Sequence, residues 1–337
     1  MNVAGLRYQA LLAREGIDVT VRPTSGSIEN IHLLQKGEAD LAFVQGGTGA
    51  SVDAPGLRSL ASLYYEPVWI FVRKRTGIEQ LADLKRRRIG IDQNGSGTRE
   101  IALLLLADNG IDSKAATLVP IGGEEAASAL RTGKLDAAFF VISPRAPIVR
   151  EILAIPGARL LNIERAPAYA LQHHFLTVLT LPEGAMDLRA NLPRRQIALL
   201  APAATLVVSE QFHPALAELL LTLARQIHGE PGLFEQAGDF SLAQISGFPN
   251  QRCRETLFQF RPAAAAALSS LLGRRPHRSA QDHTPSADHA GLSAVQAGSA
   301  DLRLAYAIAD QPLIQGSASH RGADRGQRTE RRYWFQT

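Results

Sequence analysis

The chain has 337 residues and a hydrophobic content of 45%, which suffices for a large buried core and for two lobes of ordinary size. It contains no apolar run of the roughly 18 to 20 residues that a membrane-spanning helix needs. Its net charge of +4 arises in residues 261–337, with 10 Arg against 6 Asp and Glu, whereas residues 1–260 balance 26 basic against 26 acidic residues, so composition argues against a nucleic-acid partner.

The first predicted elements alternate helix and strand. Helical spacing over residues 6–15 ends at Gly16, and alternating side chains predict a strand over 17–23. The turn Thr24-Ser25-Gly26-Ser27 then precedes a predicted helix over 28–37, for which Ser25 or Ser27 can be the cap. This helix leads into a strand that begins at Leu41, and residues 62–74 read as one further strand.

The same order starts again at residue 81. The expected elements are a short helix, a strand over 88–92, a Gly/Ser turn, a long apolar helix that ends near Gly110, strands over 116–121, 135–142 and 158–163, helices over 124–133 and 146–155, a strand-like run over 196–209, and an apolar helix over 213–229. Strands that alternate with helices of this length predict parallel sheets with helices on both faces.

One helix-to-strand corner occurs twice. Residues 34–47, "LQKGEADLAFVQGG", and residues 130–143, "LRTGKLDAAFFVIS", each place a glycine three residues before an aspartate, Asp40 or Asp136, which is followed by a buried strand. We interpret the two corners as equivalent parts of two similar sheets. If the two lobes face each other, the carboxyl ends of their strands enclose one cleft.

Each predicted lobe has a glycine- and hydroxyl-rich turn between a strand and a helix. These turns are Thr24-Ser25-Gly26-Ser27 and Gly95-Ser96-Gly97-Thr98. Free N–H groups and the helix dipole favour an anion at such a position, although a single turn of this kind can also be a plain helix cap. The second turn lacks the Gly-Lys-Ser/Thr ending of a Walker loop and the Gly-x-Ser-x-Gly of an esterase. The pair predicts a ligand held by both lobes.

These segments together resemble a known family. "VRPTSGSIENIHLLQKGEADLAFVQGG", "SLYYEPVWIFVRK", "LADLKRRRIGIDQNGSGTREIALLLLADNGI", "ALRTGKLDAAFFVIS" and "ALLAPAATLVVSEQFHPAL" are similar, in order and spacing, to the TAXI-type solute receptors of TRAP transporters. The similarity runs from about residue 4 to about residue 250. It implies an α/β, two-lobed type 2 periplasmic-binding-protein fold, with parallel-rich sheets flanked by helices and a ligand cleft between the lobes.

The resemblance also implies the organisation and the function. Lobe 1 is expected to comprise residues 1–70 and 196–255, lobe 2 residues 71–195, and the tail residues 256–337. The implied protein is a periplasmic receptor, not an enzyme, that needs no cofactor or metal. It captures a small organic anion, an amino acid or a carboxylate, for a TRAP-type membrane permease. The sequence does not choose among glutamate-like, dicarboxylate and other anions.

Further ligand-binding candidates lie near the predicted cleft. The amide of Gln45 follows a strand end, Tyr64 and Tyr65 lie with Glu66 at the expected crossing between lobes, and Arg99 follows Thr98 in the first helical turn. Arg99 could pair with a carboxylate or form a surface salt bridge. Ser143 and Arg145 are weaker candidates. The binding residues predicted from the sequence are Thr24, Ser25, Gly26, Ser27, Gln45, Tyr64, Tyr65, Ser96, Gly97, Thr98, Arg99 and Ser143.

Other site chemistries find less support. His173 and His174 point to opposite faces if they lie in a strand, and the spacing places no third metal ligand. Cys253 is the only cysteine, which excludes an internal disulfide. Two alternatives stay open: an effector-sensing or enzymatic protein on the same fold, and a non-functional truncated receptor. A regulator on this fold would carry a helix-turn-helix segment before lobe 1, and the sequence shows none. An enzyme would need acid/base or nucleophilic groups, whereas the cleft candidates are mostly hydroxyls, an amide and glycines.

The chain departs from the resembled family at both ends. Such receptors open with a signal peptide, a first strand and a glycine/tyrosine-rich loop, and this chain is expected to begin after all three, so that a central strand of lobe 1 and part of the site would be missing. Residues 256–337 are low in complexity, and we expect them to be disordered. A shift of reading frame near residue 251 is one hypothesis for this tail.

Overall fold

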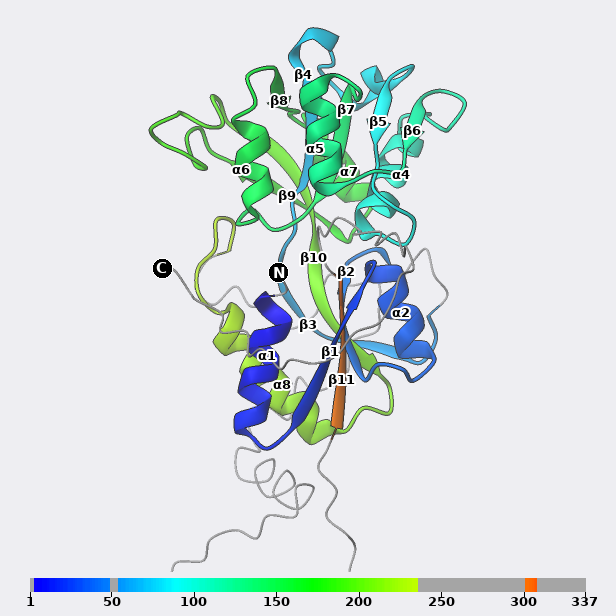
Figure 1. Ribbon diagram of the computed structural model, residues 1–337, viewed down its shortest axis with the longest axis vertical. Helices are drawn as coiled ribbons and strands as arrows, with labels where there is room; N and C mark the ends of the chain where they lie inside the picture. Colours follow the sequence, from blue (N-terminus) through cyan, green and yellow to red (C-terminus); the bar gives the residue numbers. More distant parts are fainter. Residues whose placement is uncertain (1–2, 49–53, 236–300, 308–337) are drawn as a thin grey trace, which may run out of the picture.

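The computed structural model describes residues 3–48, 54–235 and 301–307. Two lobes lie one above the other along the long axis, and each contains one central sheet with helices beside it (Figure 1). The α/β, two-lobed architecture expected from the sequence is confirmed. Within the described ranges, no helix combines the length and the apolar character that crossing a bilayer requires.

Lobe 1 is built on a mixed sheet. Across the sheet the strands are β1 (Asp18–Thr24), β11 (Asp301–Ala307), β2 (Leu41–Gln45), β10 (Ile197–Ser209) and β3 (Leu57–Tyr65). The first three run parallel, and β10 runs antiparallel to both of its neighbours, β2 and β3. Helices α1 (Val3–Arg14) and α8 (Pro214–His228) pack together near this sheet, and α2 (Ser27–Gln35) lies on the other side (Figure 1).

Burial follows from this layering. The β2 residues Leu41, Ala42, Phe43 and Val44 are all buried, because helices cover both faces of the sheet. Leu41 and Phe43 join the cluster formed with α1 and α8, whereas Ala42 and Val44 join the cluster formed with α2. The alternation of the strand therefore divides its side chains between two cores.

Lobe 2 has the second mixed sheet. Its strands, in order, are β6 (Thr117–Val119), β5 (Arg88–Gly90), β7 (Ala137–Val141), β4 (Val68–Arg73) and β8 (Ala158–Leu160). Both β6 and β7 run parallel to β5, whereas β4 runs antiparallel to β7 and β8. The helices of this lobe are α4 (Gly97–Asp108), α5 (Gly123–Thr132), α6 (Pro147–Leu153) and α7 (Ala166–Gln172), with short 3₁₀ turns at Lys74–Thr76 and Leu81–Leu84.

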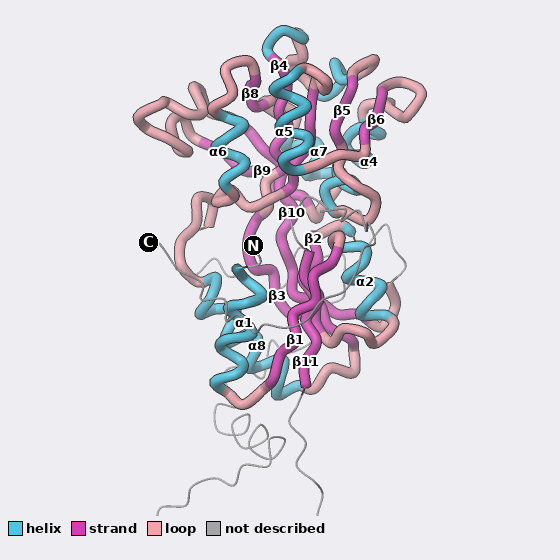
Figure 2. Tube along the Cα trace, viewed as in Figure 1, coloured by secondary structure: helices cyan, strands magenta, loops and turns pink. Residues whose placement is uncertain are grey.

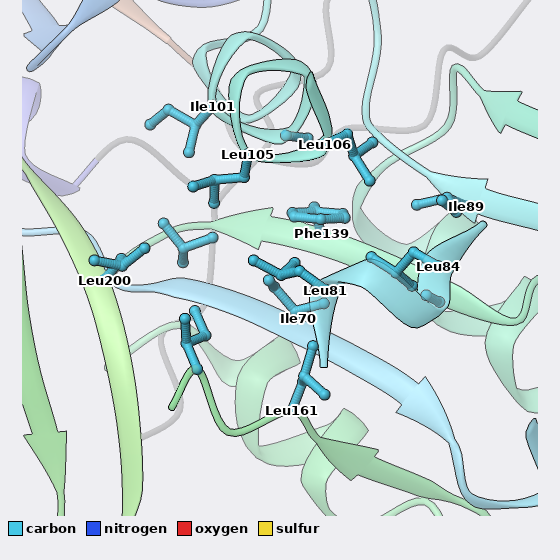
Figure 3. Close-up of a cluster of buried hydrophobic side chains, with 14 of the residues drawn as sticks. Ile70, Leu81, Leu84, Ile89, Ile101, Leu105, Leu106, Phe139, Leu161 and Leu200 are labelled. Atoms are coloured by element: carbon cyan, nitrogen blue, oxygen red, sulfur yellow. The ribbon is translucent and has the colours of Figure 1, made fainter. Parts of the chain in front are cut away.

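The α4 side of lobe 2 holds a dense apolar core. Phe139 of β7 and Ile70 of β4 are fully buried and face Leu105 and Leu106 of α4 (Figure 3). Leu200 of β10 reaches the same cluster, so a strand that begins in lobe 2 also belongs to the sheet of lobe 1.

The two lobes are joined by two extended connections (Figure 2). The upper half of β10 pairs with β9 (Leu176–Leu181), and its lower half pairs with β2 and β3. The other connection is the step from β3 to β4 at Glu66 and Pro67. The predicted single strand over 62–74 is therefore wrong: the chain changes sheets there, and proline cannot donate to a ladder.

Most other expected elements are confirmed, with bounds that differ by a few residues. The expectation of parallel sheets holds for one half of each sheet only, because β10 and β4 return antiparallel. Helix α7 and strand β9 were not predicted. Cys253 and most of the tail lie outside the described residues.

Strand β11 bears on two expectations. Residues 301–307 lie in the segment expected to be disordered, yet they form a strand between β1 and β2. The central position of lobe 1 that was expected to be vacant is therefore occupied by β11, whereas the absence of the resembled family's own first strand stays a prediction. Its alternating sequence "DLRLAYA" buries Leu302, Leu304 and Ala305.

Candidate functional site

The two glycine-rich turns meet where the lobes come together. A β-carbon built on Gly26 in lobe 1 would lie 2.6 Å from the carbonyl oxygen of Gly95 and 2.9 Å from the Cα of Ser96 in lobe 2. Gly26 has φ 150°, a conformation that favours glycine. Helices α2 and α4 begin at these turns, so their positive ends lie next to each other across the boundary.

Gln45 of lobe 1 adds a second close contact between the lobes, with Gly97 of lobe 2. A β-carbon on Gly97 would lie 1.8 Å from Gln45 Oε1 and 3.3 Å from the hydroxyl of Ser27. The backbone N–H of Gln45 donates to that same hydroxyl at 3.0 Å. A side chain at position 97 would therefore displace the amide of Gln45 from its present position, and the structure brings together the predicted residues Ser27, Gln45 and Gly97.

The side chain of Gln45 also bridges the lobes. Its Nε2 donates to the carboxylate of Glu66 at 2.7 Å and to the carbonyl of Val141 in lobe 2 at 3.2 Å, whereas Oε1 is buried and accepts no hydrogen bond from the described residues. Part of the Glu66 side chain stays accessible, but protein atoms surround its carboxyl group. Burial raises the pKa of Glu66 to about 7, and the bond from Gln45 opposes this shift.

Thr24 is used inside lobe 1. Its side chain is buried, and Oγ1 donates to Asn30 Oδ1 at 2.6 Å. The amide nitrogen of Asn30, which is fully buried, donates to the carbonyl of Phe43 at 2.8 Å. This chain of bonds ties the ends of β1 and β2 to helix α2, so the Thr24 hydroxyl already has an acceptor within its own lobe.

A carboxylate of the protein lies beside each turn. In lobe 1, both the N–H and the hydroxyl of Ser25 donate to Glu29 at 2.7 Å, and these bonds, the one from the N–H first, lower the pKa of Glu29. In lobe 2, the Ser96 hydroxyl donates to Asp92 at 2.7 Å. Ser25 and Ser96, predicted to donate to a ligand, therefore donate to carboxylates of the protein here.

The helix caps differ between the turns. Ser96 caps α4, and its hydroxyl accepts from the N–H of Thr98 at 3.1 Å. The N-cap of α2 is Gly26, with no side-chain bond to the helix, so the expectation that Ser25 or Ser27 caps this helix is wrong.

The remaining lobe 2 candidates form hydrogen bonds within lobe 2 or to the segment after α8. The buried hydroxyl of Thr98 accepts from Val141 N–H at 3.2 Å, and Arg99 donates to the carbonyl of Asp92 at 3.3 Å. Ser143 accepts from the N–H of Arg145 at 3.3 Å, and the guanidinium of Arg145 donates to the carbonyl of Pro231 at 3.2 Å. Arg145 therefore contacts the segment after α8.

The two tyrosines occupy different surroundings. The ring of Tyr64 lies 5.3 Å from that of His228 and packs on the core of lobe 1. Tyr65 packs on a core cluster of lobe 2, and its N–H donates to Glu235 at 2.9 Å. Since Phe234 also packs there, residues 231–235 contact lobe 2, although the sequence analysis assigned them to lobe 1.

Several residues of this boundary were not predicted. They are Glu29, Asn30 and Asp92, which hold the turns, and Phe175, whose ring would lie within 2.6 Å of a β-carbon on Gly47. The acidic residues could have been suspected from their position beside a helix N-terminus. His173 pairs with Asp108 at 2.7 Å, and the described parts of the chain contain no group of three or more residues that could hold a metal ion.

Comparison with known proteins identifies the family. Residues 2–212 match the NMT1-like family, which is more than half of the chain. The chain belongs to the NMT1-like family. The match covers both lobes through the end of β10, including both turns, and stops before α8 and β11.

Several solved structures are similar to this NMT1-like chain, at low sequence identity and low TM-score. They include a putative periplasmic sulfonate-binding protein from Methylobacillus flagellatus (16% identity, TM-score 0.41, 67% of this chain and 60% of that chain). An amino acid ABC transporter substrate-binding protein from Streptococcus pneumoniae bound to L-arginine is also similar (16%, 0.42, 66% and 76%). The third is the periplasmic aliphatic sulphonate binding protein from Escherichia coli (16%, 0.43, 67% and 67%).

Proposed function

We propose that this NMT1-like protein is an extracytoplasmic solute receptor that closes its two lobes on a small organic anion. The observation that carries the proposal is the meeting of the turns at Gly26 and Gly95, which brings the N-termini of α2 and α4 together. Two positive helix ends at one place favour an anion between them. A ligand would enter while the lobes are apart. It would then accept the hydrogen bonds that Ser25 and Ser96 now donate to Glu29 and Asp92.

Binding rather than catalysis fits the groups at the boundary. The predicted contacts are the hydroxyls of Ser27, Ser96 and Thr98 and the amide of Gln45, which orient a ligand by donating and accepting hydrogen bonds. The pKa of Glu66 lies near neutrality, but its hydrogen-bond partner is Gln45 rather than a nucleophile that it could activate. We therefore assign the site to recognition.

The delivery partner is proposed from the resemblance to TAXI-type receptors: a TRAP-type membrane permease, served from the periplasm. An ABC-type permease is the partner of the amino acid receptor named above. Co-purification of the tagged chain with each type of permease, produced in the same membranes, distinguishes these partners. Retention of the TRAP type alone is expected, and retention of the ABC type alone would overturn this part of the proposal.

The ligand class is tested with the full chain by thermal shift and calorimetry. The panel comprises amino acids, dicarboxylates and alkanesulfonates, with uncharged sugars of similar size as controls. A ligand present at about 100 times its Kd should stabilise the protein by about 2.7 kcal/mol. We expect a carboxylate or an amino acid to do so. Failure of all anions in the panel, or chemical conversion of a bound one, would overturn the receptor proposal.

A further inference from the structure

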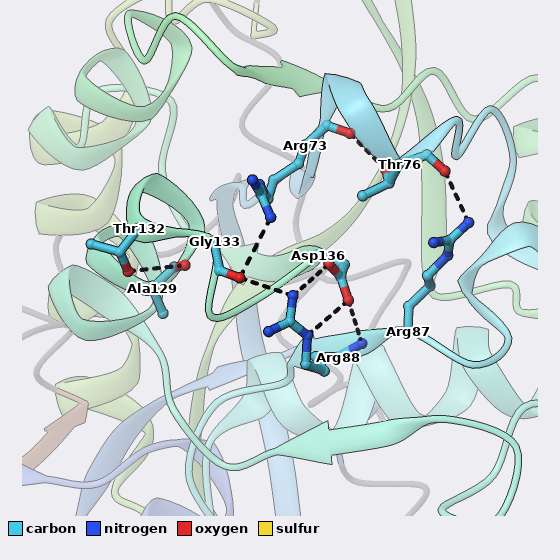
Figure 4. Close-up of polar contacts among 8 residues, drawn as sticks. All are labelled: Arg73, Thr76, Arg87, Arg88, Ala129, Thr132, Gly133 and Asp136. Atoms are coloured by element: carbon cyan, nitrogen blue, oxygen red, sulfur yellow. Dashed lines mark hydrogen bonds and ion pairs between the residues drawn. The ribbon is translucent and has the colours of Figure 1, made fainter.

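Arg303 and Asp40 in lobe 1 form the same set of bonds as Arg88 and Asp136 in lobe 2. The backbone N–H and Nε of Arg303 donate to one Asp40 oxygen at 2.7 and 3.1 Å, and Nη2 donates to the other at 3.1 Å. For Arg88 and Asp136 the same three distances are 3.0, 3.0 and 2.8 Å (Figure 4). Two far-separated arginines thus serve two equivalent aspartates.

The backbone pairing around the two arginines is also equivalent. Asp40 N–H donates to the Arg303 carbonyl at 2.8 Å, and Asp136 N–H donates to the Arg88 carbonyl at 2.9 Å. On the opposite side, Arg303 is in register with Thr20, and Arg88 is in register with Thr117. The order β1-β11-β2 therefore corresponds to β6-β5-β7, and β11 corresponds to β5.

We propose that the space between β1 and β2 is a strand-binding groove whose occupant is residues 301–307 of the same chain. In this groove the bidentate contact of Arg303 with Asp40 fixes the register. Arg303 is thus a positioning residue, which acts on lobe 1 through the sheet and not through contact with a ligand.

Burial supports the groove as a site that must be filled. Leu302 and Leu304 are 4% and 1% exposed and join the core with α1 and α8, whereas Ala305 is fully buried on the α2 side. Among the described strands, β1 pairs with β11 alone. An empty groove would expose the ladder edges of β1 and β2 and both of these apolar faces.

Filling the groove bears on the boundary between the lobes. β1 ends at Thr24, two residues before Gly26, which approaches Gly95 of lobe 2, and β2 ends at Gln45, which donates to Val141 of lobe 2. The register of β11 sets the spacing of these strand ends. This inference concerns lobe 1 itself and does not depend on the identity of any ligand.

The test uses hydrogen exchange in the full chain. Amides of residues 302–307 should exchange at least about 100-fold more slowly than in an unstructured peptide, because they belong to a buried ladder. Leu304→Asp should remove this protection and also speed exchange in β1 and β2, while β7 stays protected. The matched control Leu188→Asp changes a leucine that is 87% exposed. Unprotected amides at 302–307, or unchanged β1 and β2 in Leu304→Asp, would overturn the proposal.

A second experiment tests whether the strand in the groove comes from the same chain or from a second copy of the chain. Val21 and Leu304 are register partners with side chains in the same core, and neighbouring strands bring Cα atoms within disulfide range. With Cys253→Ser as background, Val21→Cys and Leu304→Cys should oxidise to a cross-linked monomer at micromolar protein. A disulfide-linked dimer, or no cross-link, would show that the occupant is not the chain's own strand.

The role of Arg303 is tested by Arg303→Ala, with Arg88→Ala as the lobe 2 counterpart. Exchange at residues 302–307 should become about tenfold faster in the first variant and stay unchanged in the second, which should instead loosen β5. Arg303→Lys should rescue little, because lysine cannot reproduce the bidentate contact. Unaltered exchange in Arg303→Ala would remove the register function of this residue.

Discussion

Gln45 and Glu66 are joined by a 2.7 Å hydrogen bond at the point where the chain crosses from lobe 1 to lobe 2. Gln45 ends a strand of lobe 1 and also donates to Val141 of lobe 2. Glu66 follows β3 and precedes the first strand of lobe 2. One amide therefore connects the crossing segment to both lobes, and its acceptor is a carboxyl group with a raised pKa.

Glu66→Gln should change how stability depends on pH. The pKa of Glu66 rises from 4.5 to about 7 on folding, so the folded state holds the proton more tightly, and stability from this group is present below pH 4.5 and lost as the pH rises through 7. Between these two pH values the free energy of unfolding should fall by roughly 3 kcal/mol because of this group. Urea unfolding at pH 5 and pH 8 should show that the variant gains stability over wild type at pH 8. Glu151→Gln, an exposed change, should show no such gain, and equal pH dependence in all three proteins would refute the prediction.

His228→Phe should have the opposite effect. Burial, followed by the charge of Arg7, lowers the pKa of His228 from 6.5 to about 4. Stability from this neutral imidazole is present above pH 6.5 and is lost as the pH falls through 4, again by roughly 3 kcal/mol. Phenylalanine keeps a ring beside Tyr8 and Tyr64 but does not titrate. The variant should therefore lose less stability than wild type between pH 7 and pH 4 in urea unfolding.

The two groups oppose each other between pH 4.5 and 6.5, so their contributions to wild-type stability should partly cancel there. The double variant Glu66→Gln/His228→Phe should restore the small slope of wild type. A slope in the double variant as steep as that of either single variant would contradict independent titration.

Gly97→Ala should interfere with closure. Its β-carbon would lie 1.8 Å from Gln45 Oε1, and overpacking of this kind costs about 1–3 kcal/mol. The cost falls on the joined lobes, whereas lobe 2 itself should be unaffected, so scattering should report a larger radius and any anion identified as the ligand should bind more weakly. Gly157→Ala is the control, because nothing lies within 4 Å of a β-carbon there. Adding Gln45→Ala to Gly97→Ala should restore the smaller radius; failure to do so would place the obstruction elsewhere.

Glu235→Leu should loosen the segment after α8. The carboxylate accepts from the N–H of Tyr65 at 2.9 Å, and a partly buried donor without an acceptor costs about 1–3 kcal/mol. Glu235→Gln keeps an acceptor oxygen and serves as the control. Urea unfolding should show a lower midpoint for Leu than for Gln, and limited proteolysis should show faster cleavage near residues 229–235. Equal behaviour of the two variants would mean that this contact contributes nothing measurable.

The alternation of helices and strands was accessible from the sequence because local patterns determine it. Gly37 and Gly133 end two helices with positive φ, and the aspartates three residues later were recognised as equivalent. The arginines that pair with these aspartates, Arg88 and Arg303, were not predicted, because they lie far from the aspartates in the chain. The apolar alternation in "DLRLAYA" was a usable signal for β11, but the composition around it favoured disorder.

The positions of the two turns could be predicted, whereas their hydrogen-bond partners could not. Thr24 and Ser96 were predicted as ligand contacts from their places before helices, and that role remains a prediction. Local sequence could not show that Asn30 and Asp92 accept from these hydroxyls. Such partners follow from how the strand ends pack together, which spacing along the chain does not encode.

The place of β11 has a consequence for the order in which the protein folds during synthesis. Lobe 2 can assemble once the ribosome has released about the first 200 residues, because all the strands of its sheet lie between Val68 and Leu160. Lobe 1 must wait, since Asp18 pairs with Asp301. Contacts of such long range form slowly, and an unpaired edge exposed meanwhile invites aggregation. Until residues 301–307 are available, the edges of β1 and β2 on either side of β11 stay unpaired.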